Sequence, residues 1–129
     1  MFNPITIPFG SKMLFNGVKL KPGVTVADIE LALGEMCHTV KETYGNDSGG
    51  FIAGQVFAFS GFISSEGSVN PVKEPDYDIA IVTYWASFEQ HEKSHADKAF
   101  RDKFHALAEM STDTFEVGFD MLWQGVPEK

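Results

Sequence analysis

The segment His91–His95 carries the most specific chemical pattern in the chain, His-Glu-x-x-His. On one unbroken helix, two histidines four residues apart lie on the same face and ligate zinc, while the glutamate acts as a base. Two features argue against this. The polar residues Gln90, Lys93 and Asp97 surround the motif, whereas zinc peptidases bury it among uncharged residues. Ser94, with Asp97 three residues later, has the form of a helix cap, which predicts a break inside the motif.

A zinc site also needs a third ligand, and none lies at a recognised spacing downstream. Glu109 and Glu116 provide carboxylates further along the chain. We therefore expect no metal, and we keep a zinc site on the segment His91-Glu92-x-x-His95 as a remote alternative.

Asn16 is a polar residue on an otherwise apolar strand face, which it shares with Leu14, Val18 and Leu20. A buried carboxamide without partners costs about 1–3 kcal/mol. Such a group either holds an oxygen of a substrate in an apolar pocket, or bonds to backbone or water at a strand irregularity beside Gly17. The sequence leaves both interpretations open.

His95 and two aromatic residues are further candidates, each with a structural alternative. Histidine, with an ordinary pKa of about 6.5, suits proton removal from a phenol or an activated C–H group. The alternative for His95 is an exposed position in the first turn of a helix. Trp85 and Phe100 line a substrate pocket or belong to the core. His38 and His105 are expected at the surface.

The composition limits the class of protein. A chain of 129 residues with 43% hydrophobic content fits one globular domain. The net charge of −8, with a basic cluster of Lys19 and Lys21 alone, argues against nucleic acid and anionic membranes as partners. The single Cys37 excludes an internal disulfide. Without a signal-peptide pattern or a long apolar stretch, we expect a cytoplasmic protein.

Strand patterns account for much of the chain. Residues 1–11, with their prolines, indicate an extended arm that needs a surface to lie on. We expect one domain over residues 12–125. Alternating apolar and polar residues, or apolar residues on both faces, predict strands over 12–21, 51–63, 78–85 and 115–124.

Helices are predicted by capping residues and by apolar spacing. Thr25 and Asp28 have the form of a capping box, and an apolar stripe follows at spacings of three and four, which predicts a helix over 26–44. Ser87 begins a short helix that breaks near Ser94, and a second helix continues to about Met110.

This order predicts an α+β protein with a ferredoxin-like β-α-β-β-α-β arrangement, an antiparallel sheet with its helices on one face. The other face is too apolar to lie against water. A second copy of the sheet would cover it, so we expect a homodimer with the form of a dimeric α/β barrel.

Two segments carry a resemblance to known proteins. The first is the strand Asn16-Gly-Val-Lys-Leu-Lys-Pro-Gly23 with the helix start at 27–29, and the second is Trp85-Ala-Ser87 followed by Glu89, His95, Asp97 and Phe100. On these segments, residues 13–124 resemble the dimeric α/β-barrel superfamily. The branch they resemble is that of antibiotic-biosynthesis and haem-degrading monooxygenases. Asn16 matches the haem-degrading pattern, but Ser94 and Phe104 stand where that pattern has Trp and His, so haem degradation is not expected.

The resemblance implies a small cofactor-independent monooxygenase-like enzyme acting on a compact aromatic or quinol-type molecule. It implies Asn16 and His95 as catalytic residues, with no cofactor. The alternative is a non-catalytic dimeric protein that binds a small apolar or aromatic ligand. The expected substrate pocket consists of Trp85, Phe100, His91 and Phe104.

Overall fold

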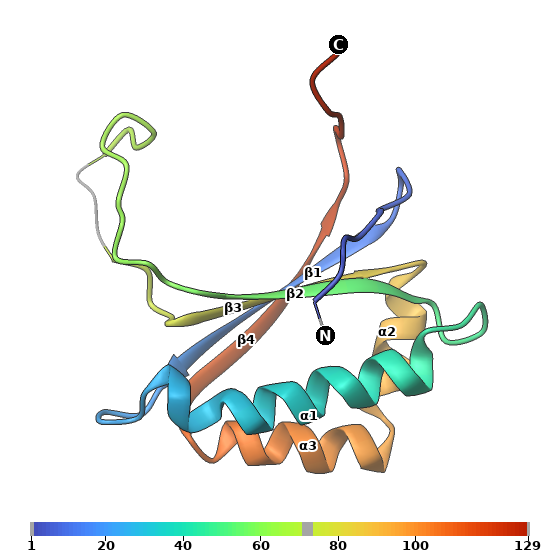
Figure 1. Cartoon of the computed structure of the whole chain (residues 1–129), viewed down its shortest axis with the longest axis horizontal. Helices are drawn as coiled ribbons and strands as arrows, with labels where there is room; N and C mark the ends of the chain where they lie inside the picture. Colours follow the sequence, from blue (N-terminus) through green and yellow to red (C-terminus); the bar gives the residue numbers. More distant parts are fainter. Residues whose placement is uncertain (1, 71–73, 129) are drawn as a thin grey trace.

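The computed structural model describes residues 2–70 and 74–128, which form one sheet covered by helices on one side (Figure 1). The strands pair antiparallel in the order β2-β3-β1-β4. This order confirms the predicted α+β, ferredoxin-like arrangement. Within the described residues the elements are β1 (Lys12–Leu20), α1 (Val26–Tyr44), β2 (Phe51–Ala58), β3 (Ile79–Trp85), α2 (Phe88–His95), α3 (Lys98–Ala108) and β4 (Ser111–Asp120).

The core lies between the helices and the sheet. The predicted stripe of α1 is buried, with Ile29 fully inaccessible, and it meets the helix-facing residues Leu14 and Val18 of β1. The capping box that begins α1 forms as expected: Thr25 N donates to Asp28 Oδ2 at 2.8 Å, and Asp28 N donates to Thr25 Oγ1 at 3.4 Å. Leu107 of α3, the second long helix on this side of the sheet, is fully buried in the same core.

Two strands end earlier than the sequence predicts, because a strand ends where its neighbour ends. The second strand was expected to reach residue 63 but stops at Ala58, whose partner is Ile79, the first residue of β3. The fourth was expected over 115–124 but covers 111–120. Its last pair joins Asp120 to Lys12, the first residue of β1.

The predicted helix break is displaced by two residues, and this changes the geometry of the His-Glu-x-x-His segment. Helix α2 continues through His95, and α3 is capped by Asp97, whose side chain accepts a hydrogen bond from Ala99 N at 2.8 Å. Ser94 does not cap a helix. Its hydroxyl donates to His91 O at 2.6 Å inside α2, so the two histidines remain on one unbroken helix.

The sheet face opposite the helices is apolar and half-exposed. Phe57, Phe115, Val117 and Phe119 are between 40% and 50% exposed there. Residues 59–70 after β2 and the segment after β4 extend away from the helices on this side of the sheet (Figure 1). Residues 2–11 of the predicted arm contain no helix or strand, and residue 1 lies outside the described residues. No described helix is long and apolar enough to span a membrane.

Candidate functional site

Three side chains from α2 and β4 converge on the helix side of the sheet. His91 and His95 lie one turn apart on α2, and their Nε2 atoms are 3.0 Å from each other. Oε1 of Glu116 is 3.1 Å from Nε2 of His91 and 3.0 Å from Nε2 of His95. We call these three residues the His–His–Glu cluster. The expectation that a break in the helix separates the two imidazoles was wrong, because the break follows His95.

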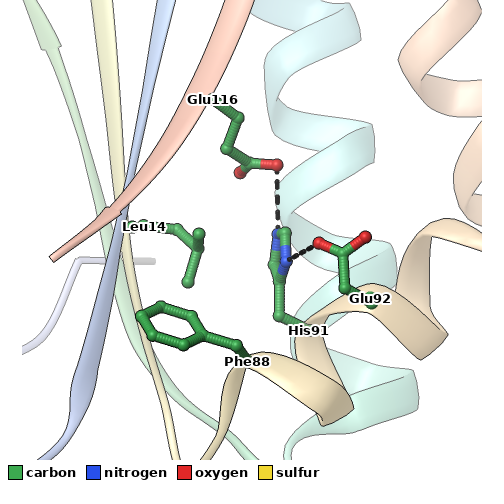
Figure 2. Close-up of a pocket in the computed structure, with 6 residues that line it drawn as sticks. Leu14, Phe88, His91, Glu92 and Glu116 are labelled. Carbon is green, nitrogen blue, oxygen red and sulfur yellow. Dashed lines mark hydrogen bonds and ion pairs between the residues drawn. The ribbon is translucent and has the colours of Figure 1, made fainter.

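A second carboxylate holds the other ring nitrogen of His91. Oε1 of Glu92 lies 3.1 Å from Nδ1 of this residue, so the imidazole is placed between two glutamates (Figure 2). The His91 side chain is 4% exposed, whereas that of Glu92 is 75% exposed. A buried imidazole with both nitrogens engaged is fixed in orientation.

The electrostatics of the cluster follow from burial and from mutual contact. Burial alone would lower the pKa of His91, but the hydrogen bond and charge of Glu116, and then those of Glu92, outweigh it and raise that pKa. Burial would raise the pKa of Glu116, but hydrogen bonds with His91 and His95 lower it to about 2. Glu116 is therefore a carboxylate at neutral pH.

Aromatic rings support the imidazoles from behind. The edge-on Trp85 ring is 5.2 Å from the His91 ring, and the Phe100 ring is 4.8 Å from the His95 ring, between ring centres. Phe104 stacks on Phe100 at 6.2 Å. Trp85 is 2% exposed and Phe100 is 7% exposed. The aromatic residues expected as pocket walls therefore lie in or against the core and position the histidines.

Asn16 lies beside the cluster. In the β1–β4 pairing it stands directly opposite Glu116, and residues opposite each other in a strand pair share one sheet face. Asn16 is 7% exposed, and its Oδ1 has no hydrogen-bond partner among the described residues. Leaving this oxygen unpaired costs about 1–3 kcal/mol, so the position is a place where a bound group would gain a contact.

An open pocket of about 350 Å³ adjoins the cluster. Its polar side is His91 with Glu92 and Glu116, and its apolar side includes Leu14 and Phe88 (Figure 2). Gly118 completes the lining, and a Cβ there would stand 2.6 Å from Cε1 of Phe88, so this glycine leaves room for the ring. The volume is in the range of small-molecule sites.

Of the predicted site residues, Asn16, His91 and His95 come together, and only His91 of these lines the pocket. The prediction did not include Phe88 or Leu14 among the site residues, and Glu92 and Glu116 entered it only through the remote zinc alternative. For Glu116 a signal existed, since a charged residue alternates there with apolar residues 115, 117 and 119. Its position beside Asn16, however, depends on the register between the first and last strands.

Comparisons with known proteins identify the fold. The sequence matches no protein-family model and no curated protein. Among solved structures, it is similar to SnoaB, a cofactor-independent oxygenase from Streptomyces nogalater, with a TM-score of 0.62 and 14% identity over 92% of this chain and 99% of that one. It is also similar to a dimeric ferredoxin-like protein of unknown function from Thermobifida fusca, with a TM-score of 0.59 and 13% identity over 94% and 100%.

A third similar structure is a conserved protein of unknown function and possible oxidoreductase from Bacteroides thetaiotaomicron. Its TM-score is 0.56, with 14% identity over 88% of this chain and 100% of that one. At these identities the likeness establishes the fold. The predicted resemblance to ferredoxin-like dimeric proteins, among them a cofactor-independent oxygenase, is confirmed at that level.

Proposed function

We propose that this protein is a small oxygenase-like enzyme that acts on a compact aromatic or quinol-type molecule and uses neither flavin nor haem. One observation carries the proposal: the His–His–Glu cluster stands at one side of an open pocket whose other side is apolar. Such a pocket binds a ring against its apolar side and a hydroxyl against its polar groups. The similar fold of a cofactor-independent oxygenase supports the reaction class.

The pocket residues take distinct roles in this proposal. Phe88 and Leu14 contact the ring of the substrate, Glu92 accepts the proton of its hydroxyl group, and Glu116 accepts a hydrogen bond from that group. Asn16 stands opposite Glu116 but is not part of the pocket lining, so the proposal gives it no direct contact with the substrate. His95 holds Glu116 in place through their 3.0 Å contact.

Dioxygen is the oxidant in the proposed reaction. When a ring CH₂ or CH group is converted to a carbonyl, one oxygen atom enters the product and the other leaves as water. The substrate supplies the electrons, because its deprotonated form is a strong reductant. The chain therefore has to bind the substrate, remove a proton and admit oxygen, and the open pocket with its two carboxylates supports the first two steps.

We also propose that the protein works as a homodimer joined through the sheet face opposite the helices. That face carries half-exposed apolar residues of β2 and β4, and Tyr77 packs against only part of it, beside Phe115. Exposed apolar residues continue into the neighbouring segments, including Phe62 at 77% and Trp123 at 80%. A patch of this kind is typical of a protein interface, and a similar fold is known as a dimer.

Oxygen consumption tests the proposed activity. Purified protein is mixed with a panel of hydroquinones, naphthoquinols and anthrones, and the rate is compared with that of buffer. We expect one substrate class to raise oxygen uptake. Glu116→Gln should lower that uptake about 100-fold, because it removes the carboxylate that holds both histidines in position beside the pocket. His38→Gln, a change at an exposed histidine on α1, is the matched control and should keep the full rate.

An uptake equal to that of buffer for every compound would contradict the enzyme. Saturable binding of a quinol without oxygen uptake would instead support the alternative, a non-catalytic dimeric protein that binds a small ligand. The specific observation behind this alternative is that an open pocket with polar groups on one side and apolar groups on the other suits ligand binding as well as catalysis.

A further inference from the structure

We propose that the His–His–Glu cluster binds one divalent first-row transition metal ion, with its open coordination positions toward the pocket. The inference deepens the proposed function and rests on it only for the location of the substrate. Metal binding itself follows from the geometry of His91, His95 and Glu116.

The three potential ligand atoms form a nearly equilateral triangle. The separations are 3.0 Å between the two Nε2 atoms, and 3.1 Å and 3.0 Å from these to Oε1 of Glu116. With a metal ion about 2.1 Å from all three atoms, each ligand–metal–ligand angle would be about 90°. That angle belongs to one face of an octahedron, whereas tetrahedral angles at the same distance need separations of about 3.4 Å. Two histidines and one carboxylate on one octahedral face are a known ligand set for divalent iron.

A metal ion fits these three atoms better than hydrogen bonds between them do. Both Nε2 atoms approach the same oxygen and also each other, so two N–H groups aimed at Oε1 of Glu116 would crowd together. Glu92 lies 3.1 Å from Nδ1 of His91 and favours a proton on that nitrogen. A metal ion that displaces the proton of Nε2 would bind the lone pair of that nitrogen. A carboxylate that holds the far nitrogen of a ligating histidine is the usual outer contact of a metal site.

The surroundings also suit a bound ion. Trp85 and Phe100 pack edge-on against the two imidazoles and fix their planes. The side of the cluster that carries His91 and Glu116 opens to the pocket, where water or a substrate hydroxyl reaches the remaining coordination positions. Asn16, opposite Glu116 on the same sheet face, adds a buried oxygen without a partner among the described residues.

A metal ion in this position would serve the proposed chemistry directly. A hydroxyl group bound to a divalent cation has a strongly lowered pKa, and its proton is released more easily. With Glu116 bound to the metal, Glu92 still lines the pocket and remains as the proton acceptor. Two nitrogen ligands favour Co²⁺, Fe²⁺ and Zn²⁺ over Mg²⁺ and Ca²⁺.

Cobalt titration without substrate tests the site. Untagged full-length protein is stripped with a chelator, dialysed and titrated with Co²⁺, and binding is followed by visible absorption and by calorimetry. We expect about one Co²⁺ per chain, displaced by Zn²⁺ and not by Mg²⁺. Glu116→Gln and His95→Gln should each weaken binding at least about 100-fold, and Glu92→Gln about 10-fold, as an outer contact does.

His38→Gln and His105→Gln alter exposed histidines outside the cluster and should leave Co²⁺ affinity unchanged. Circular dichroism of each variant confirms that it is folded. The proposal is overturned if folded wild-type protein binds no Co²⁺, or if Glu116→Gln and His95→Gln bind it as tightly as wild type. Because no substrate is present, this outcome is separate from that of the oxygen-uptake experiment. A protein that binds Co²⁺ but oxidises no quinol would retain the site and lose the proposed function.

Discussion

Phe119 on β4 is the residue whose replacement most directly tests the proposed dimer. It projects from the sheet face opposite the helices and is 49% exposed in the single chain. A phenylalanine side chain buries about 200 Å² when fully covered, so a second copy would cover about 100 Å² of this residue. At about 25 cal/mol per Å², truncation to alanine removes about 2 kcal/mol of burial from each protomer.

A two-fold interface contains Phe119 twice, so Phe119→Ala should cost about 4 kcal/mol in dimer stability and raise the dissociation constant about a thousandfold. Analytical ultracentrifugation over a dilution series measures this constant. Leu31→Ala is the matched control, because Leu31 is 74% exposed on the outer face of α1 and lies away from the interface. Its dissociation constant should equal that of wild type.

Two results would refute this reasoning. One is a wild-type protein that sediments as a monomer at micromolar concentrations. The other is an equal effect of Leu31→Ala and Phe119→Ala, which would show that association does not use the sheet face.

Three further changes have defined outcomes. Gly118→Ala places a Cβ 2.6 Å from the Phe88 ring and should narrow the pocket. We expect the affinity for any quinol that binds to be at least 10-fold weaker by calorimetry. An unchanged melting temperature is the control. Thr25→Ala removes the cap that Asp28 N donates to and should lower the free energy of unfolding by about 1 kcal/mol in urea titrations; no change would mean that the first turn of α1 is frayed. Burial first, and then its hydrogen bond to a carboxylate, raise the pKa of Tyr44 to about 12. The protonated hydroxyl therefore stabilises the fold fully below the ordinary value of about 10, and this contribution is lost as the pH rises to about 12. Tyr44→Phe should remove the tyrosinate absorbance step near pH 12.

Much of the fold could be predicted because its signals are local. The capping pair Thr25 and Asp28 and the stripe that follows define α1 without reference to the rest of the chain. Strand ends are different, since β4 stops at Asp120 only because β1 begins at Lys12. An apolar segment forms a strand only where an adjacent strand pairs with it, and that pairing depends on the arrangement of the whole sheet.

The site was harder to predict because it depends on two choices that the local sequence leaves open. A serine followed by Asp three residues later fits a helix cap, but a serine inside a helix bonds equally well to the carbonyl three residues before it. Ser94 does the latter, and His91 and His95 stay together as a result. Glu116 joins them only through the register that sets it opposite Asn16, a contact between residues 100 positions apart in the chain.

The contact between the Trp85 and His91 rings gives this protein a built-in optical reporter. The indole is buried and lies 5.2 Å from the imidazole at the side of the pocket, whereas the only other tryptophan, Trp123, is 80% exposed. In a Trp123→Phe variant all indole fluorescence would come from beside the cluster. Paramagnetic Co²⁺ or an aromatic ligand arriving there would quench it, so that occupancy of the pocket could be read in real time without a label.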